Sequence, residues 1–136
     1  LLMGEAVVFF GKEKARFAEN FRKQNAQLFS KMRFVAAQFI PYFEQKLWYS
    51  NAHHANQMAQ KLKSLLEPLP QVALARGVEA NSVFAIMPPE SIPAVQEQFF
   101  FYIWNDARNE VRLMTSFATE EWELQAFANF LKNTLG

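Results

Sequence analysis

The spacing of apolar residues changes at Pro68 and Pro70, and this change constrains the fold more than any other feature. Before these prolines, apolar side chains recur every third or fourth residue, the spacing of one helix face. One such series is Met32, Val35, Phe39, Phe43 and Leu47, and a second series with the same period follows in Ala52, Ala55, Met58, Leu62, Leu65 and Leu66. After the prolines, short apolar runs alternate with glycine, proline or polar residues, which is typical of strands. The sequence therefore predicts an α+β chain, with a helical N-terminal half followed by a small β-α-β-β-α sandwich that carries its helices on one sheet face.

The helical half is expected to contain two or three helices, because the pattern over residues 12–66 is too long for one ordinary helix and has no heptad repeat. Pro41 predicts a kink or a break near Ile40, since proline cannot donate the backbone hydrogen bond of a helix interior. Upstream, the apolar run 6–10 is expected to be a strand buried on both faces. It has no obvious partner strand before residue 71, as would be the case if its sheet lay outside this chain.

The second half contains four apolar runs that predict strands. They lie at residues 72–76, 82–87, 99–104 and 111–117. The run 99–104 is the densest and is expected to be buried, whereas the polar link 105–109 predicts an antiparallel hairpin. No apolar run approaches the roughly 20 residues that a membrane span requires. We therefore expect no membrane association.

Two helices are predicted between and after these strands. Ser91 is expected to cap a short helix over residues 91–98, with a proline in its first turn. A last helix is expected to begin at Thr119, where the following acidic residues favour the positive end of the helix dipole. Its buried stripe is predicted to comprise Ala126, Phe127, Phe130 and Leu131.

The composition excludes several kinds of site. The chain has no cysteine and only 4 glycines, so thiolate metal sites, cysteine nucleophiles and glycine-rich phosphate loops are absent. His53 and His54 are adjacent, and adjacent helical residues point about 100° apart, so the pair cannot grip one metal ion as an i, i+4 pair can. We expect one packed and one more exposed histidine, and no metal.

A basic stretch with interleaved phenylalanines lies between residues 12 and 33. Its cations are Lys12, Lys14, Arg16, Arg22, Lys23, Lys31 and Arg33, and its aromatic residues include Phe17, Phe21 and Phe29. Such a pattern fits a solvated helical face, a contact to one small anion, or a nucleic-acid surface. The solvated face is the favoured interpretation. The net charge of +1 argues against a nucleic-acid partner.

Arg112 is unusual because it lies inside a strand-like apolar stretch, between Val111 and Leu113. An unpaired charge in a protein core is costly, so this arginine requires either solvent or a partner. Side chains alternate along a strand, which places Arg112 on the face opposite its two neighbours. Two interpretations remain open: a side chain pointing to solvent on the outer sheet face, and a fork-shaped clamp for a carboxylate.

Several segments in order along the chain resemble the threonine aldolase family, or β-eliminating lyases, within the fold-type I pyridoxal 5'-phosphate (PLP) enzymes. They are residues 4–10 (GEAVVFF), 22–24 with 30–34 (RKQ and SKMRF), 47–48 with 51–59 (LW and NAHHANQMA), 78–81 with 83–85 (VEAN and VFA), and 101–104 with 111–117 (FYIW and VRLMTSF). Together they identify this chain as resembling the C-terminal portion of such an enzyme.

The resemblance implies roles for two arginines. Arg33, in the Met-Arg segment, is similar to a family arginine that reaches the PLP phosphate across the subunit interface. Arg112 is similar to the small-domain arginine that holds the substrate α-carboxylate. The implied activity is that of an aldehyde-lyase, which cleaves a β-hydroxy-α-amino acid of the L-threonine class to glycine and an aldehyde. The family also implies a cytoplasmic homotetramer built as a dimer of dimers.

The resemblance also implies what this chain lacks. In the family, a Thr-Lys-Asn-Gly segment carrying the PLP lysine closely precedes the segment similar to residues 4–10, and none of Lys12, Lys14 or Lys23 lies in such a context. We therefore expect the chain to begin just after that lysine, to contain no catalytic residue and to be inactive alone. The expected organisation is a large-domain remnant over 1–30, linking helices over 31–68 and a small domain over 69–136. A non-enzymatic helical interaction module is the alternative.

Overall fold

The computed structural model describes residues 3–28 and 30–136 of the chain. Contacts divide the chain into two compact units, Leu1–Trp48 and Tyr49–Gly136. The boundary falls inside a helix, so the second unit includes residues 49–66 of the segment that was expected to link two domains. The domain limits after residues 30 and 68 stay a prediction.

The described residues of the N-terminal unit form three complete helices: α1 (Lys12–Ala15), α2 (Ala18–Gln24) and α3 (Met32–Glu44). Its packing centres on α3, where Val35 is buried. Gly4 lies against this helix with φ at 146°, and a Cβ atom at that position would approach the side chains of Val35 and Phe39 to about 3 Å. The glycine therefore permits a close approach that a larger residue would prevent.

Two expectations for this unit are wrong. Residues 6–10 form no strand, and their apolar side chains are exposed, with Phe10 at 90%. An extended segment becomes a strand only when a neighbour satisfies its backbone, and the described residues supply none. The helix also does not break near Ile40, since α3 continues through Pro41 to Glu44; the alternative, a kink there, stays a prediction. Gln45 is the C-cap, and the next residue, Lys46, has a φ of 54°, which is incompatible with a helix.

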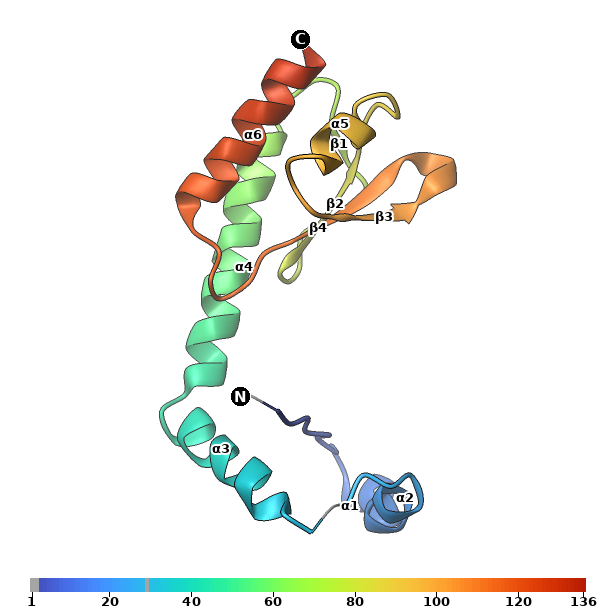
Figure 1. Cartoon of the computed structure of the whole chain (residues 1–136), viewed down its shortest axis with the longest axis vertical. Coiled ribbons are helices and arrows are strands. Elements are labelled where there is room, and N and C mark those ends of the chain that lie inside the picture. Colours follow the sequence, from blue (N-terminus) through green and yellow to red (C-terminus); the bar gives the residue numbers. More distant parts are fainter. Residues whose placement is uncertain (1–2, 29) are drawn as a thin grey trace. The chain divides into compact units, whose positions relative to one another are not determined.

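The C-terminal unit combines a four-stranded antiparallel sheet with three helices (Figure 1). The strands are β1 (Ala73–Leu74), β2 (Ser82–Ile86), β3 (Tyr102–Asn105) and β4 (Glu110–Met114), in the spatial order β1-β2-β4-β3. The helices are α4 (Leu47–Leu66), whose first two residues belong to the other unit, α5 (Ile92–Gln96) and α6 (Glu121–Leu135). This arrangement confirms the α+β class.

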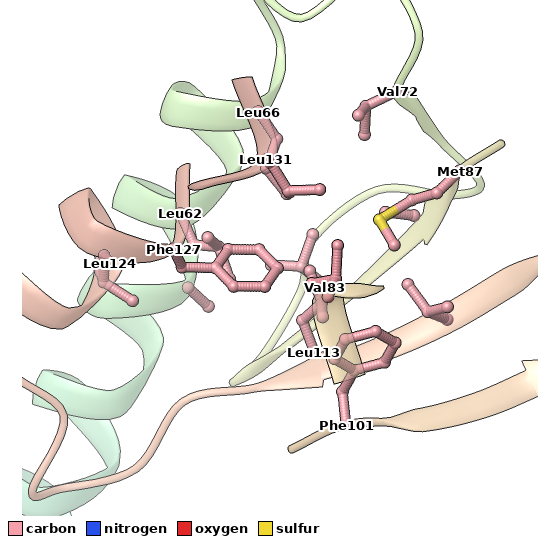
Figure 2. Packing of buried hydrophobic residues seen from close by; sticks show 14 of the residues in the cluster. Leu62, Leu66, Val72, Val83, Met87, Phe101, Leu113, Leu124, Phe127 and Leu131 are labelled. Atoms are coloured by element: carbon pink, nitrogen blue, oxygen red, sulfur yellow. The ribbon is translucent and has the colours of Figure 1, made fainter. Parts of the chain in front are cut away.

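The hydrophobic core lies on one face of the sheet. Alternate residues of β2 and β4 point into it, including the fully buried Val83 and Val111. Figure 1 shows α4 and α6 side by side next to the sheet, and Figure 2 shows Leu62 of α4 and Phe127 of α6 directed toward Val83. The helices thus cover one face of the sheet and leave its opposite face for other contacts.

The β3–β4 hairpin confirms the prediction for residues 105–109. A 3-10 turn, Asp106–Arg108, is followed by Asn109 in the left-handed conformation, and a register shift lies between Ile103 and Asn105. The expected burial of residues 99–104 is wrong for residues 102–104, because β3 is the edge strand and all its residues are exposed. In the first part of that run, Phe101 is buried in the core and Phe99 packs against it.

The helix starts differ in detail from the prediction. Ser91 occupies the N-cap position of α5, but its hydroxyl donates to Pro88 O at 2.7 Å and makes no cap hydrogen bond. Glu120, rather than Thr119, caps α6 through a capping box with Glu123. Within the last helix Ala126 is exposed; the buried residues are Leu124, Phe127, Ala128 and Leu131.

The end of β4 is tied to α4 and to the loop before β2. Thr115 is 2% exposed, and its hydroxyl donates to Ala55 O at 2.7 Å. Its backbone N–H donates to Asn81 O at 3.0 Å, and the Asn81 side chain donates back to Thr115 O at 2.8 Å. These bonds hold the strand that carries Arg112.

Candidate functional site

The candidate site lies on the face of the sheet that the helices leave uncovered. In β2 and β4 the inward residues are buried, so Ser82, Phe84 and Arg112 share the opposite face. The register places Phe84 directly opposite Arg112 on one side and Tyr102 opposite Arg112 on the other. A polar and aromatic surface therefore surrounds this arginine.

Arg112 is held on that face by one hydroxyl and two rings. Its Nε and Nη2 both donate to Ser82 Oγ, each at 3.3 Å. Its Cζ lies 5.4 Å from the Trp104 ring centroid and 6.0 Å from that of Phe84, within the range of cation–π attraction. The two rings meet edge to face at 5.4 Å. The side chains of neighbouring strands therefore orient the guanidinium, although Arg112 is partly exposed.

Two neighbouring arginines are already paired with an acid. Glu110 is 1% exposed, and its carboxylate forms ion pairs with Arg76 and Arg108. Arg76 also lies over the Phe84 ring, at 4.1 Å from its centroid. Arg112, in contrast, has no acidic partner among residues 3–28 and 30–136. Of these three arginines, Arg112 is thus the one available to an external anion.

Arg33 lies in the N-terminal unit, at the second position of α3, and its side chain is exposed. Within the described residues it makes no ion pair, so its guanidinium is free to contact an anion. The other basic side chains between residues 12 and 33 are also exposed, as expected for a solvated face. Phe29, part of that pattern, lies outside the described residues.

The two histidines have separate roles. His54 is partly buried and its Nε2 lies 2.8 Å from Thr119 O, whereas His53 is exposed and stacks on Tyr49. This confirms one packed and one more exposed histidine. Over the described part of the chain, no group of three acidic or histidine side chains is arranged to hold a metal ion. Nor does that part include a helix with the length and hydropathy of a membrane span.

Sequence reasoning did not find the partners of Arg112. Phe84 and Trp104 lie in segments that resemble the family, but the resemblance assigned them no role, and Ser82 lies in none of these segments. Alternation along the strand was the signal that grouped two of them, because it places Ser82 and Phe84 on one face. Which strand lies beside β4 depends on a contact between segments about 30 residues apart, which local patterns do not reveal.

Two proteins of known activity are similar to the chain over most of its length. No family model matches the chain. A low specificity L-threonine aldolase of Pseudomonas sp. (strain NCIMB 10558) is 35% identical over 128 residues, 94% of this chain and 37% of the relative. Its counterpart from Pseudomonas aeruginosa is 31% identical over 136 residues, 100% of this chain and 39% of the relative. These matches support a likeness to the C-terminal portion of threonine aldolases.

A solved structure of Leishmania major threonine aldolase agrees with this likeness. It superposes with a TM-score of 0.55 at 34% identity and covers 61% of this chain and 25% of that one. The expected resemblance to the C-terminal portion of a threonine aldolase is therefore confirmed. The chain spans 37% and 39% of the length of the two Pseudomonas relatives.

Proposed function

We propose that this chain supplies the substrate-carboxylate site of a PLP-dependent threonine aldolase, which cleaves β-hydroxy-α-amino acids of the L-threonine class to glycine and an aldehyde. The observation that carries the proposal is the combination of a fixed orientation and a missing acidic partner at Arg112. It is oriented by Ser82 and two rings, yet it lacks an acidic partner among the described residues. A guanidinium matches a carboxylate with two parallel hydrogen bonds, so this arginine suits the α-carboxylate of an amino acid.

The residues of the chain fit part of a PLP site. The exposed, unpaired guanidinium of Arg33 suits a phosphate group, as the family resemblance implies. When bound, PLP supplies the electron sink for the carbanion formed by carbon–carbon cleavage. The contribution of Arg112 is positional, because a fixed carboxylate fixes the orientation of the bond to be cleaved. The homotetramer and the cytoplasmic location remain part of this proposal and rest on the resemblance.

The carboxylate role can be tested in an enzyme in which this chain replaces the matching C-terminal portion of the Pseudomonas aeruginosa relative. Arg112→Lys should lower kcat/KM for L-threonine by about 10- to 100-fold, because an ammonium cannot form the paired bonds. Arg22→Lys, at an exposed position of α2, is the matched control and should change kcat/KM for L-threonine less than twofold. Equal kinetics for both variants in a folded, PLP-loaded enzyme would contradict the proposal.

The chain alone is proposed to be inactive. None of its eight lysines lies in the family's Thr-Lys-Asn-Gly context, and none of their side chains is buried. The test is to mix the chain with PLP, reduce with borohydride and digest for mass spectrometry. We expect scattered substoichiometric labelling. One stoichiometric adduct on a single lysine would show that an attachment site is present.

The apolar surface of the N-terminal unit supports the proposed oligomer. Phe17, Phe21 and Phe34 are 53–68% exposed, and monomers rarely expose so many large apolar side chains. We expect these residues to be covered by other parts of the assembled enzyme. Light scattering after size exclusion should therefore show self-association of the isolated chain. A monodisperse monomer at all concentrations would contradict this part of the proposal.

A further inference from the structure

We propose that Ser82 holds Arg112 by one edge of its guanidinium, so that the substrate carboxylate is received end-on, by Nη1 and Nη2. The inference rests on the proposed carboxylate role of Arg112. It assigns Ser82 as a positioning residue, which acts through the arginine without touching the substrate.

The occupied edge follows from the hydrogen bonds. A guanidinium is planar and offers five N–H groups, arranged along a side edge (Nε and Nη2) and an end edge (Nη1 and Nη2). Ser82 Oγ accepts from Nε and from Nη2, both at 3.3 Å, and therefore occupies the side edge. No residue of the described chain forms an ion pair with the end edge. An approaching carboxylate thus finds its two parallel donors at the end edge.

The sheet register explains why Ser82 can hold this position. Ser82 pairs with Met114 and Phe84 pairs with Arg112, so Ser82 is the diagonal neighbour of the arginine on the same face. Diagonal neighbours in a sheet are about 7–8 Å apart, within reach of a long side chain. The serine side chain is short and attached to a central strand, so its oxygen cannot follow a moving arginine.

The aromatic rings complete the restraint. Phe84 and Trp104 both lie within 6.0 Å of the guanidinium carbon, and their edge-to-face contact fixes them relative to each other. Rotation of the guanidinium about its side-chain bonds would break the hydrogen bonds to Ser82 and the contacts with both rings. The end edge therefore keeps one direction, and the carboxylate bound there lies in the guanidinium plane.

The test is nitrogen-15 NMR of the arginine side chains in the chain itself, with acetate as the probe. Solvent exchange of the Arg112 Nε–H should be slow relative to that of the exposed Arg22 and Arg33. Ser82→Ala should accelerate it by about threefold to tenfold, because the hydrogen bond that Nε–H donates to Ser82 Oγ is lost together with that from Nη2. Ser82→Thr should restore the slow exchange, and Ser64→Ala, which removes an exposed hydroxyl on α4, should leave it unchanged.

Acetate is then added in place of chloride at constant ionic strength. We expect the Arg112 Nη resonances to shift while the Nε–H stays protected. Loss of that protection on acetate binding, or unchanged exchange in the Ser82→Ala variant, would overturn the end-on arrangement while acetate binding still supported the carboxylate role. If no Arg112 resonance responds to acetate, the proposed carboxylate role itself fails, whatever the exchange rates show.

Discussion

The two faces of the four-stranded sheet differ in what their residues contact. The inner face contributes Val83 and Val111 to a core shared with three helices. The outer face contributes Phe84 and Arg112 to a partly exposed surface of charge and aromatic rings. The same two strands therefore stabilise the fold on one side and present chemistry on the other. The difference predicts that substitutions on the two faces affect different measurements.

The largest expected effect is a loss of stability in the core that α6 forms against the inner face of the sheet. Leu131→Ala removes a fully buried side chain of α6 and should lower the free energy of unfolding by about 2–5 kcal/mol. Met114→Ala removes a half-exposed side chain from the outer face and should cost much less. Urea denaturation, followed through the amide resonances of β2 and β4, measures both. Similar losses would show that the faces are not distinct.

The second effect concerns Glu110, the buried acid at the start of β4, just after the hairpin turn. Glu110→Gln should lower the free energy of unfolding by about 1–3 kcal/mol, because a buried carboxylate bonded to Arg76 and near Arg108 loses its charge. Glu121→Gln, which breaks the exposed pair with Lys61, is the control and should cost at most about 1 kcal/mol. The same urea titration applies. A cost at residue 110 no greater than at residue 121 would contradict the structural role of this acid.

The third effect tests how far the outer face contributes to stability. Trp104→Ala should cost about 0.5–1.5 kcal/mol, because it removes the edge-to-face contact with Phe84. Trp122 is similarly large and 69% exposed in the first turn of α6, and Trp122→Ala should be nearly neutral. Thermal unfolding of the two variants measures the difference. An effect above about 3 kcal/mol at residue 104 would place this ring in the core.

The smallest effect on stability is expected at Arg112 itself. Arg112→Gln should change the free energy of unfolding by no more than about 0.5 kcal/mol, since the side chain is partly exposed and outside the core. The same substitution should abolish the response to acetate. A destabilisation above about 1.5 kcal/mol would mean that the arginine serves the fold, and the contrast between the faces would weaken.

Local patterns were sufficient to predict much of the C-terminal unit. The polar residues before Glu110 predicted the hairpin, and the spacing that includes Phe127 and Leu131 predicted the last helix. Both structures depend on residues close together in the chain, so their signals survive in a short window. Arg112 was also found in this way, because one charge interrupts an apolar strand.

Other features could not be predicted because they depend on what covers a segment. Residues 6–10 and Ile103 are as apolar as core residues, yet they are exposed. An apolar composition shows that a segment can pack against a neighbour, but it does not show whether that neighbour is present. The partners of Arg112 have the same limitation. Ser82 is 30 positions away, and only the strand register brings it near.

The tie at Thr115 has an entropic consequence for binding. Because its hydroxyl and backbone anchor the end of β4 to Ala55 and Asn81, the backbone beneath Arg112 is ordered when the chain folds. A ligand that binds there does not have to order a loop. It has only side chains to immobilise, at about 0.5–1.5 kcal/mol for each flexible one. Part of the entropic cost of recognition is thus met during folding, before any ligand arrives.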